Sequence, residues 1–165
     1  MRQATPARLF DLPALAALEA LCFKHPGERF SRRVIRGLLR NPRAVVRTAR
    51  VDGRLIGWAA GLLRQRGAAS SGRLYALAVH PEFRGKHWGE TLAIAALDLL
   101  RRRGATRFSL EVGVRNQGAR RLYEKLGFRP SGLLPDYYGP GLHGLRMRRQ
   151  GVVIPSAARH LGVTG

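Results

Sequence analysis

Cysteine is almost absent from this sequence, since Cys22 is the single example in 165 residues. One thiol excludes an intramolecular disulfide and a cysteine-based zinc cluster. Cys22 falls in the stretch LEALCFK, on the apolar side of an expected helix, so we expect a core thiol without a chemical role. The histidines show no ligand spacing, and we expect no metal.

Long apolar runs are missing too, because no stretch approaches the ~20 residues that a membrane-spanning helix needs. No signal peptide opens the chain, so we expect a soluble, cytoplasmic protein without a membrane partner. The length suits one compact domain and is short for two. We expect a single domain over residues 1–149 and a C-terminal tail over 150–165 that is free to be flexible. Monomer and homodimer both stay open.

Acidic residues are scarce: 10 stand against 30 basic ones, which gives a formal net charge of +20. Arg32, Arg36 and Arg40 repeat every four residues on one expected helix, and like charges at that spacing cost a helix roughly 0.2–0.5 kcal/mol per pair. An anionic partner would offset this cost, so contact with RNA, a ribosomal surface or an acidic protein is one interpretation. A solvated face is the simpler alternative.

Turn residues and apolar periodicity predict a mixed order of elements. Strands are expected where short apolar runs lie between turn signals, at 2–6, 44–51, 54–63, 73–79, 107–112, 128–132 and 145–149. Helices are expected where apolar residues recur at helical spacing, at 12–22, 32–40, 90–103 and 117–126. The expected N-caps are Asp11, Ser31 and Asn116. Asp52-Gly53 predicts a two-residue hairpin turn, and 64–72 a polar loop.

The stretch VHPEFRGKHWGETL, residues 79–92, has the features of a phosphate-binding loop. Gly85 and Gly89 allow tight turns, successive backbone N–H groups can point at an anion, and the following helix offers its positive end. Arg84 and Lys86 add positive charge. The loop follows an expected strand and opens an expected helix, which is the context that such a motif requires.

A wider pattern joins this loop to LEVGVRNQGARRLYEKLGF and DYYG further along the chain. The pattern resembles the GCN5-related N-acetyltransferase (GNAT) superfamily, and its spacing is similar to the RimI-like branch, the protein N-terminal alanine acetyltransferases. The resemblance covers about residues 1–149 and is sharpest over 74–128. It implies a mixed α/β fold, with a mostly antiparallel, twisted sheet of six to seven strands and about four helices in the order β-α-α-β-β-β-α-β-α-β-β.

The resemblance also implies roles for particular residues. Backbone amides of the loop would hold the pyrophosphate of acetyl-CoA, from Arg84, Gly85, Lys86, His87, Trp88 and Gly89. The strand through Leu77, Ala78 and Val79 would pair with the pantetheine arm, and Asn116 would contact the cofactor. Tyr123 would face the departing thiol, and Glu111 stands where RimI-like enzymes carry their proposed general base.

His87 departs from the family signature, Gln/Arg-x-x-Gly-x-Gly/Ala, whose ends match Arg84 and Gly89. The histidine keeps the backbone N–H but adds a Cβ and a ring. If the position needs a positive φ, a residue other than glycine costs about 1–2 kcal/mol. We expect a tolerated substitution with the ring turned to solvent; a retuned or inactive cofactor site is the alternative.

The two catalytic candidates each have a structural alternative. Glu111 shares a strand face with Ser109 and Gly113, and it can act as a general base through a water or form an ion pair with an arginine. Tyr123 lies on a helical apolar stripe, so it can be a core aromatic. A phenol of pKa ~10 protonating a thiolate of pKa ~8.5 is uphill by about 2 kcal/mol, so a hydrogen bond to the thiolate competes with full proton transfer.

Asp136, Tyr137 and Tyr138 fall in the loop LLPDYYGPG and are candidates for the acceptor pocket, with a simple turn as the alternative. We expect direct transfer of an acetyl group from acetyl-CoA to a primary amine. A protein N-terminal amine fits best, because its pKa near ~8 leaves more neutral amine than lysine at ~10.4. A lysine, a small amine or aminoacyl-tRNA as acceptor, or a non-catalytic RNA- or ribosome-binding module, are the alternatives.

Overall fold

The computed structural model describes residues 2–150, which form a twisted sheet of seven strands in the order β1-β2-β3-β4-β5-β7-β6. β4 and β5 run parallel, and the other neighbouring pairs are antiparallel. The strands are β1 (Ala4–Pro6), β2 (Ala44–Val51), β3 (Arg54–Arg66), β4 (Ala69–Val79), β5 (Arg107–Gly113), β6 (Arg129–Leu134) and β7 (Gly144–Gln150). The expected mixed α/β, mostly antiparallel sheet is confirmed.

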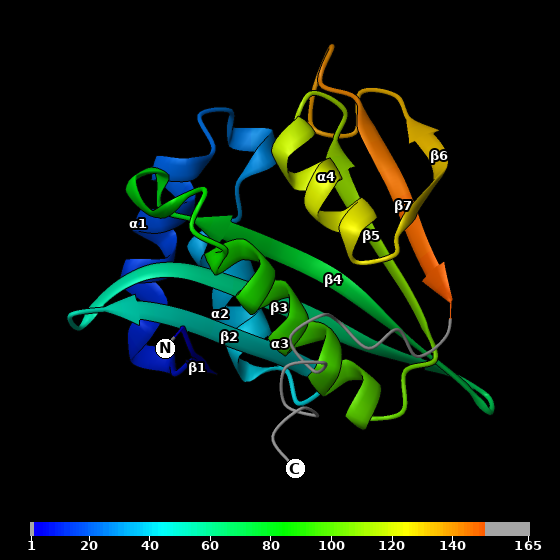
Figure 1. Cartoon of the computed structure of the whole chain (residues 1–165), viewed down its shortest axis with the longest axis horizontal. Helices are drawn as coiled ribbons and strands as arrows, with labels where there is room; N and C mark the ends of the chain where they lie inside the picture. Colours follow the sequence, from blue (N-terminus) through cyan, green and yellow to red (C-terminus); the bar gives the residue numbers. More distant parts are fainter. Residues whose placement is uncertain (1, 151–165) are drawn as a thin grey trace.

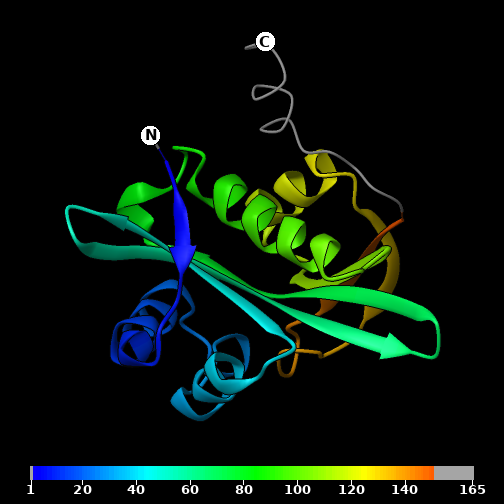
Figure 2. The ribbon, with the colours of Figure 1, turned by 90° about the horizontal axis from the view of Figure 1, so that it is seen from below.

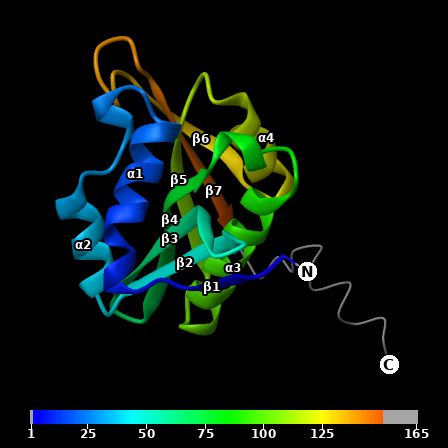
Figure 3. The same ribbon diagram turned by 90° about the vertical axis from the view of Figure 1, so that its left-hand side faces the viewer.

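Helices cover the sheet from both sides (Figures 1, 2 and 3). α1 (Leu12–Cys22) and α2 (Arg32–Arg40) lie on one face, and α3 (Trp88–Arg102) and α4 (Gln117–Lys125) on the other. None of the helices within residues 2–150 is long and apolar enough to cross a membrane. Apart from Gln150, the expected C-terminal tail lies outside the described residues.

Local signals explain most of the boundaries. The Ser31 hydroxyl accepts a hydrogen bond from Val34 N–H (3.3 Å), and Asn116 Oδ1 accepts from Ala119 N–H (3.2 Å), so two expected N-caps are confirmed. Asp11 does not cap α1 with its side chain. A short 3-10 turn precedes this helix, and the Asp11 carboxylate reaches back to the N–H of Arg8 (2.8 Å).

A further expectation about this half of the chain is wrong. The segment 64–72 is not a loop: β3 and β4 continue as a ladder to Arg66 and Ala69, because backbone pairing extends a hairpin beyond its apolar core. Leu21 and Val34 lie on the apolar stripes of α1 and α2, yet they are 52% and 37% exposed. Both helices bury a narrower stripe, through Leu15, Leu18 and Ile35.

The core has one cluster on each face of the sheet. The α3–α4 side packs Leu92, Leu97 and Leu100 against Phe108 and Phe128. The α1–α2 side packs Leu12, Leu15, Leu18 and Ile35 around the fully buried Trp58. Each cluster fixes one pair of helices against the sheet, so the loops at the carboxyl end of β4 are held from both sides.

Candidate active site

A break in strand pairing accompanies a deep opening in the sheet. β4 pairs with β5 over Ser71–Leu74. Tyr75 is then an extra residue in β4, because Gly61 pairs with Leu74 while Ala60 pairs with Ala76. Such a bulge bends its strand, and β4 and β5 separate beyond it (Figure 1). A cleft of about 890 Å³ lies between them, a volume typical of small-molecule sites.

The loop from Arg84 to Gly89 closes one end of this cleft. Arg84 Nε donates a hydrogen bond to Val79 O (3.0 Å), which ties the loop to the end of β4. Gly85 has a φ of +71°, a conformation that glycine adopts without strain. The first helical hydrogen bond of α3 runs from Thr91 N–H to His87 O (3.1 Å). The amides of Trp88 and Gly89 precede it, so they are available to an anion at the positive end of α3.

His87 stands in the left-handed region, with a φ of +66° and a ψ of 15°. The side chain is 69% exposed, and its Nδ1 lies 3.4 Å from Glu90 Oε2. The expected solvent-facing ring is therefore confirmed, and the positive φ is the conformation in which a Cβ costs about 1–2 kcal/mol. His87 therefore keeps the left-handed backbone conformation of the loop, at the cost of local strain.

The other predicted cofactor residues fall into two groups. Leu77, Ala78 and Val79 line the cleft from β4. The Trp88 ring also touches the cleft, but it is 9% exposed and belongs to the core cluster under α3. The Lys86 side chain is not among the cleft-lining groups; its Nζ lies 5.5 Å from the centroid of the Phe83 ring. For Lys86 and Trp88, only the backbone N–H groups fit the predicted role of binding the pyrophosphate.

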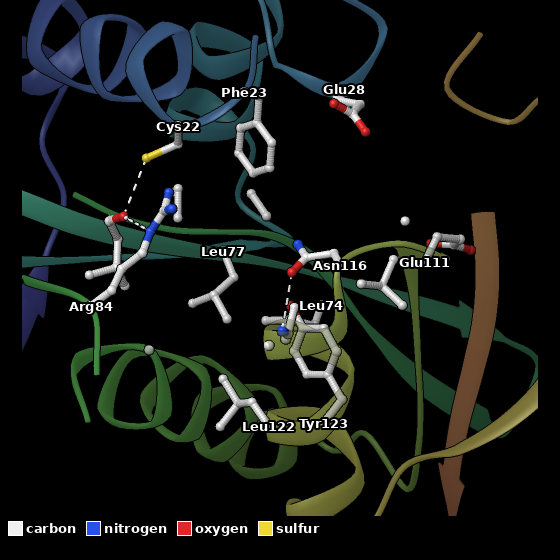
Figure 4. A pocket seen from close by; sticks show the side chains of 18 of the residues that line it. Cys22, Phe23, Glu28, Leu74, Leu77, Arg84, Glu111, Asn116, Leu122 and Tyr123 are labelled. Carbon is white, nitrogen blue, oxygen red and sulfur yellow. Dashed lines mark hydrogen bonds between the residues drawn. The ribbon is translucent and has the colours of Figure 1, made fainter. Parts of the chain in front are cut away.

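Asn116 enters the cleft from the N-cap of α4 and Tyr123 from its last turn (Figure 4). The side-chain oxygen of Asn116, Oδ1, already accepts the N-cap hydrogen bond from Ala119 N–H. The side-chain nitrogen, Nδ2, is therefore the group that can donate to a ligand. Tyr123 is 6% exposed and packs edge-on against Phe128. Burial raises the pKa of Tyr123 well above its ordinary value, so its hydroxyl stays protonated and can donate a hydrogen bond.

Glu111 lies where β5 leaves β4, with both carboxylate oxygens engaged. Oε2 accepts from Arg73 Nε (2.8 Å) and Oε1 from Arg146 Nε (3.3 Å). These arginines come from the two neighbouring strands, β4 and β7. The ion pair that the sequence left as an alternative is therefore present. A carboxylate has about four acceptor positions, so Glu111 can still accept a hydrogen bond from a water or an amine in the cleft.

Two loops close the acceptor side, and they touch. A Cβ built on Gly27 would lie 1.8 Å from Tyr138 O, so the segment after α1 contacts the β6–β7 loop directly. Tyr138 lines the cleft, and burial raises its pKa, with smaller contributions from the nearby Tyr137, Glu111 and Glu28. The Tyr137 hydroxyl accepts from Arg73 Nη2 (3.1 Å).

Asp136 does not face the cleft. Its Oδ1 accepts from Gly141 N–H (2.8 Å), and its own N–H donates to His143 Nδ1 (3.0 Å). The carboxylate therefore braces the loop in which it stands. Its φ of +53° shows a tight turn, which was the alternative interpretation of this stretch.

The cleft also contains residues that the sequence did not single out. Glu28 Oε1 would lie 3.9 Å from a Cβ on Gly113, so its carboxylate reaches the end of β5 (Figure 4). Phe30 stacks on Tyr75 with ring centroids 5.0 Å apart. The sequence offered one signal for these two residues. A charged residue, Glu28, and an aromatic residue, Phe30, follow the turn residues Pro26-Gly27 a few positions after the expected helix 12–22. Cys22 lines the cleft with Sγ 3.4 Å from Val79 O, rather than being enclosed in the core.

Glu19 is a second unexpected carboxylate. It lies on α1, is 1% exposed and lines the inner end of the cleft. Burial raises its pKa to about 7, although the Phe30 N–H, 3.2 Å from Oε1, and the neighbouring Trp58 indole oppose the rise. The hydrogen bond from the Phe30 N–H connects Glu19 to the segment that follows α1.

Within residues 2–150, no group of three or more histidine, cysteine, aspartate or glutamate side chains is placed to hold a metal ion. The expectation that no metal takes part stays a prediction.

Comparison with known proteins agrees with this geometry. Residues 12–128 match the model of the Acetyltransferase (GNAT) family. The chain is 34% identical over 131 residues to a putative [ribosomal protein bS18]-alanine N-acetyltransferase of Bacillus subtilis, which covers 79% of this chain and 83% of that protein.

Solved structures share the fold at lower identity. The Escherichia coli ribosomal-protein-S18-alanine N-acetyltransferase superposes with a TM-score of 0.77 at 22% identity, over 93% of this chain and 96% of that one. Arabidopsis thaliana Naa50, solved with the bisubstrate analogue CoA-Ac-MVNAL, gives a TM-score of 0.77 at 19% identity, over 90% and 98%. With the matched family spanning most of the cleft-forming segments, this chain belongs to the GNAT family and is an N-acetyltransferase that uses acetyl-CoA.

Proposed function

We propose that this enzyme transfers the acetyl group of acetyl-CoA directly to the N-terminal α-amino group of a protein, and that it does so in the cytoplasm. The observation that carries the proposal is a cleft lined by residues from both faces of the sheet. The anion-binding loop at α3 forms one end, and the Gly27–Tyr138 contact borders the other. The Bacillus subtilis relative is named as a ribosomal-protein alanine N-acetyltransferase, and Naa50 was solved with a bisubstrate analogue that joins CoA to a peptide, which supports a polypeptide acceptor here.

For the donor side, we assign the phosphates to the amides of residues 85–89, because the Arg84 N–H donates to Pro81 O (3.4 Å), and the pantetheine arm to the β4 edge at Leu77–Val79. This edge is available because β4 has already left β5. The side chain of Asn116 would add a hydrogen bond from its amide nitrogen. The residues present therefore fit acetyl-CoA through backbone groups and the side-chain amide of Asn116. His87 does not interrupt this set, because it contributes a backbone N–H as any residue but proline would.

For the chemical step, the amine nitrogen attacks the thioester carbonyl carbon, the C–S bond breaks, and the amine loses a proton. We assign the proton to Glu111 through a water, because its carboxylate lies in the cleft where β4 and β5 separate. We assign Tyr123 to the sulfur, where its protonated hydroxyl would stabilise the developing thiolate by a hydrogen bond. Glu28 and Tyr138 would hold the amine on the opposite side.

The test is mass spectrometry of peptides incubated with the enzyme and acetyl-CoA. A peptide with a free α-amino group should gain one acetyl group at that nitrogen, and a peptide blocked there but carrying lysine should gain little. Glu111→Gln should slow transfer with unchanged acetyl-CoA binding. Equal acetylation of both peptides would move the acceptor from the α-amine to lysine.

A second role has its own observation. The arginines on and beside α2 are exposed and enter no ion pair within residues 2–150; they are Arg29, Arg32, Arg33, Arg36, Arg40 and Arg43. We propose that this face contacts RNA or a ribosomal surface. Steeply salt-dependent RNA binding, weakened by Arg32→Gln/Arg36→Gln, would support it.

A further inference from the structure

A second, polar hollow adjoins the acceptor side of the cleft. Its volume is about 360 Å³, and four arginines line it together with Glu111 and Tyr137: Arg64, Arg73, Arg146 and Arg148. We call this hollow the arginine basin. Glu111 lines both the basin and the cleft, so the two spaces adjoin at that residue.

Strand register explains why the basin is basic and open. Phe108, Leu110 and Val112 of β5 pack toward α3 and α4, so Ser109 and Glu111 face the opposite side of the sheet. Arg148 of β7 is paired with Ser109, and Arg73 of β4 is paired with the same residue from the other edge. Neither α1 nor α2 extends below β5 and β7 (Figure 2), so no described helix covers this face.

The charges in the basin are not balanced. Glu111 is the one carboxylate among its lining residues, and it is engaged by Arg73 and Arg146. Arg64 and Arg148 are exposed and enter no ion pair within residues 2–150. Gathering four guanidinium groups around one carboxylate is unfavourable without an anion, and guanidinium binds carboxylates with matched geometry.

The charges of the cleft and of the arginine basin indicate how an acceptor chain would lie across them. Glu28, beside Gly113, presents negative charge at the cleft, where an amine would be held next to Glu111. Arg148, opposite Ser109, lies two strand positions back from Glu111, which is about 7 Å along the sheet. An extended peptide advances about 3.3–3.6 Å per residue. A chain whose amine lies at Glu111 therefore brings its second to fourth residues over the basin.

We propose that the arginine basin is a specificity site for acidic side chains at positions two to four of the acceptor protein. This proposal rests on the proposed function, since it assumes that a polypeptide amine enters the cleft. The basin would favour aspartate or glutamate there and disfavour lysine or arginine.

The test compares peptides that begin with alanine and carry three aspartates, three asparagines or three lysines at positions two to four. For the unaltered enzyme, KM should be about three- to tenfold lower for the aspartate peptide than for the asparagine peptide, since exposed ion pairs contribute modestly. Added salt should reduce the difference. Arg148→Glu and Arg64→Glu should each remove the preference for aspartate and improve KM for the lysine peptide, with kcat unchanged.

Arg121→Glu on α4 is the matched control, because Arg121 is also exposed and lies on the opposite face of the sheet. It should leave the preference intact. An aspartate preference that is absent, or that survives both basin variants, overturns the proposal while acetylation itself stands. Should Arg148→Glu fold poorly, Arg64→Glu and the salt series still decide the result.

Equilibrium binding of the same peptides, fluorescently labelled at the C-terminus, separates this proposal from the proposed function. If no peptide is acetylated but aspartate binding still depends on Arg64 and Arg148, the proposed function fails and the anion site stands. If an RNA oligonucleotide binds through these two arginines and the aspartate peptide does not, the acidic-acceptor proposal is wrong.

Discussion

Gly27 and Tyr138 are in such close contact that a Cβ on Gly27 would lie 1.8 Å from the Tyr138 carbonyl oxygen. The two residues are 111 positions apart in sequence, and their contact lies beside the cleft, which Tyr138 lines. The neighbour is backbone, so no side-chain rotation can relieve a clash.

Gly27→Ala should therefore force the two loops apart. We expect a stability loss of about 1–3 kcal/mol, as for other overpacked sites, and an acceptor KM raised more than the Kd of acetyl-CoA. Gly37→Ala is the control, because a Cβ at Gly37 in α2 meets no atom within 4 Å. It should stabilise the helix by about 0.5–1 kcal/mol. Unchanged melting and KM in Gly27→Ala would remove this contact from the acceptor site.

Local structure was largely predictable from the sequence, because its signals act over a few residues. Ser31 and Asn116 cap the helices as expected, and Asp52-Gly53 forms the expected turn with φ values of 50° and 79°. The loop over 84–89 was also identified by its glycines and its place between strand and helix. The sequence left the φ of His87 open, and the structure places it in the left-handed region.

Features that depend on the pairing of distant segments were not predictable. The bulge at Tyr75 arises from the register between β3 and β4, which periodicity does not reveal. The arginine partners of Glu111 come from β4 and β7, so they could not be identified before the strand order was known. Glu19 shows the same limit: it looks like a surface residue of an amphipathic helix and is buried by α1 packing on the sheet.

His87→Gly should stabilise the protein by about 1 kcal/mol, because it relieves a left-handed conformation that a Cβ opposes. His87→Ala keeps the Cβ and removes only the exposed ring, so it should not give this gain. The free energy of unfolding from urea denaturation checks both. Acetyl-CoA affinity should be retained in either variant, since the backbone N–H is present in each; equal stability of the two variants would contradict the strain.

Glu19 should make stability depend on pH. Burial raises the pKa of Glu19 from its ordinary value of 4.5 to about 7, so the folded protein holds a proton that the unfolded chain releases. The stabilising effect is complete below about pH 4.5 and is lost as pH rises through about 7. This difference corresponds to up to about 3 kcal/mol.

Glu19→Gln should abolish this loss, so its melting temperature relative to the unaltered protein should rise between pH 5 and 8. Glu124→Gln, on the exposed face of α4, is the control and should shift little. A Glu19→Gln variant that follows the same pH dependence as the unaltered protein would show that Glu19 is already ionised at low pH.

Tyr123→Phe should lower kcat by about 10²-fold with little change in the Kd of acetyl-CoA, because it removes one hydrogen-bond donor aimed at the leaving sulfur. Burial raises the pKa of Tyr123, so the hydroxyl does not ionise in the usual assay range. The alkaline limb of the pH–rate profile should therefore be the same in Tyr123→Phe and the unaltered enzyme, although the rates differ. Tyr75→Phe removes the same atom from another wall of the cleft and should change kcat far less. If instead Tyr123→Phe shifts the alkaline limb, the phenol is giving up its proton during turnover, and Tyr123 acts as an acid rather than as a hydrogen-bond donor.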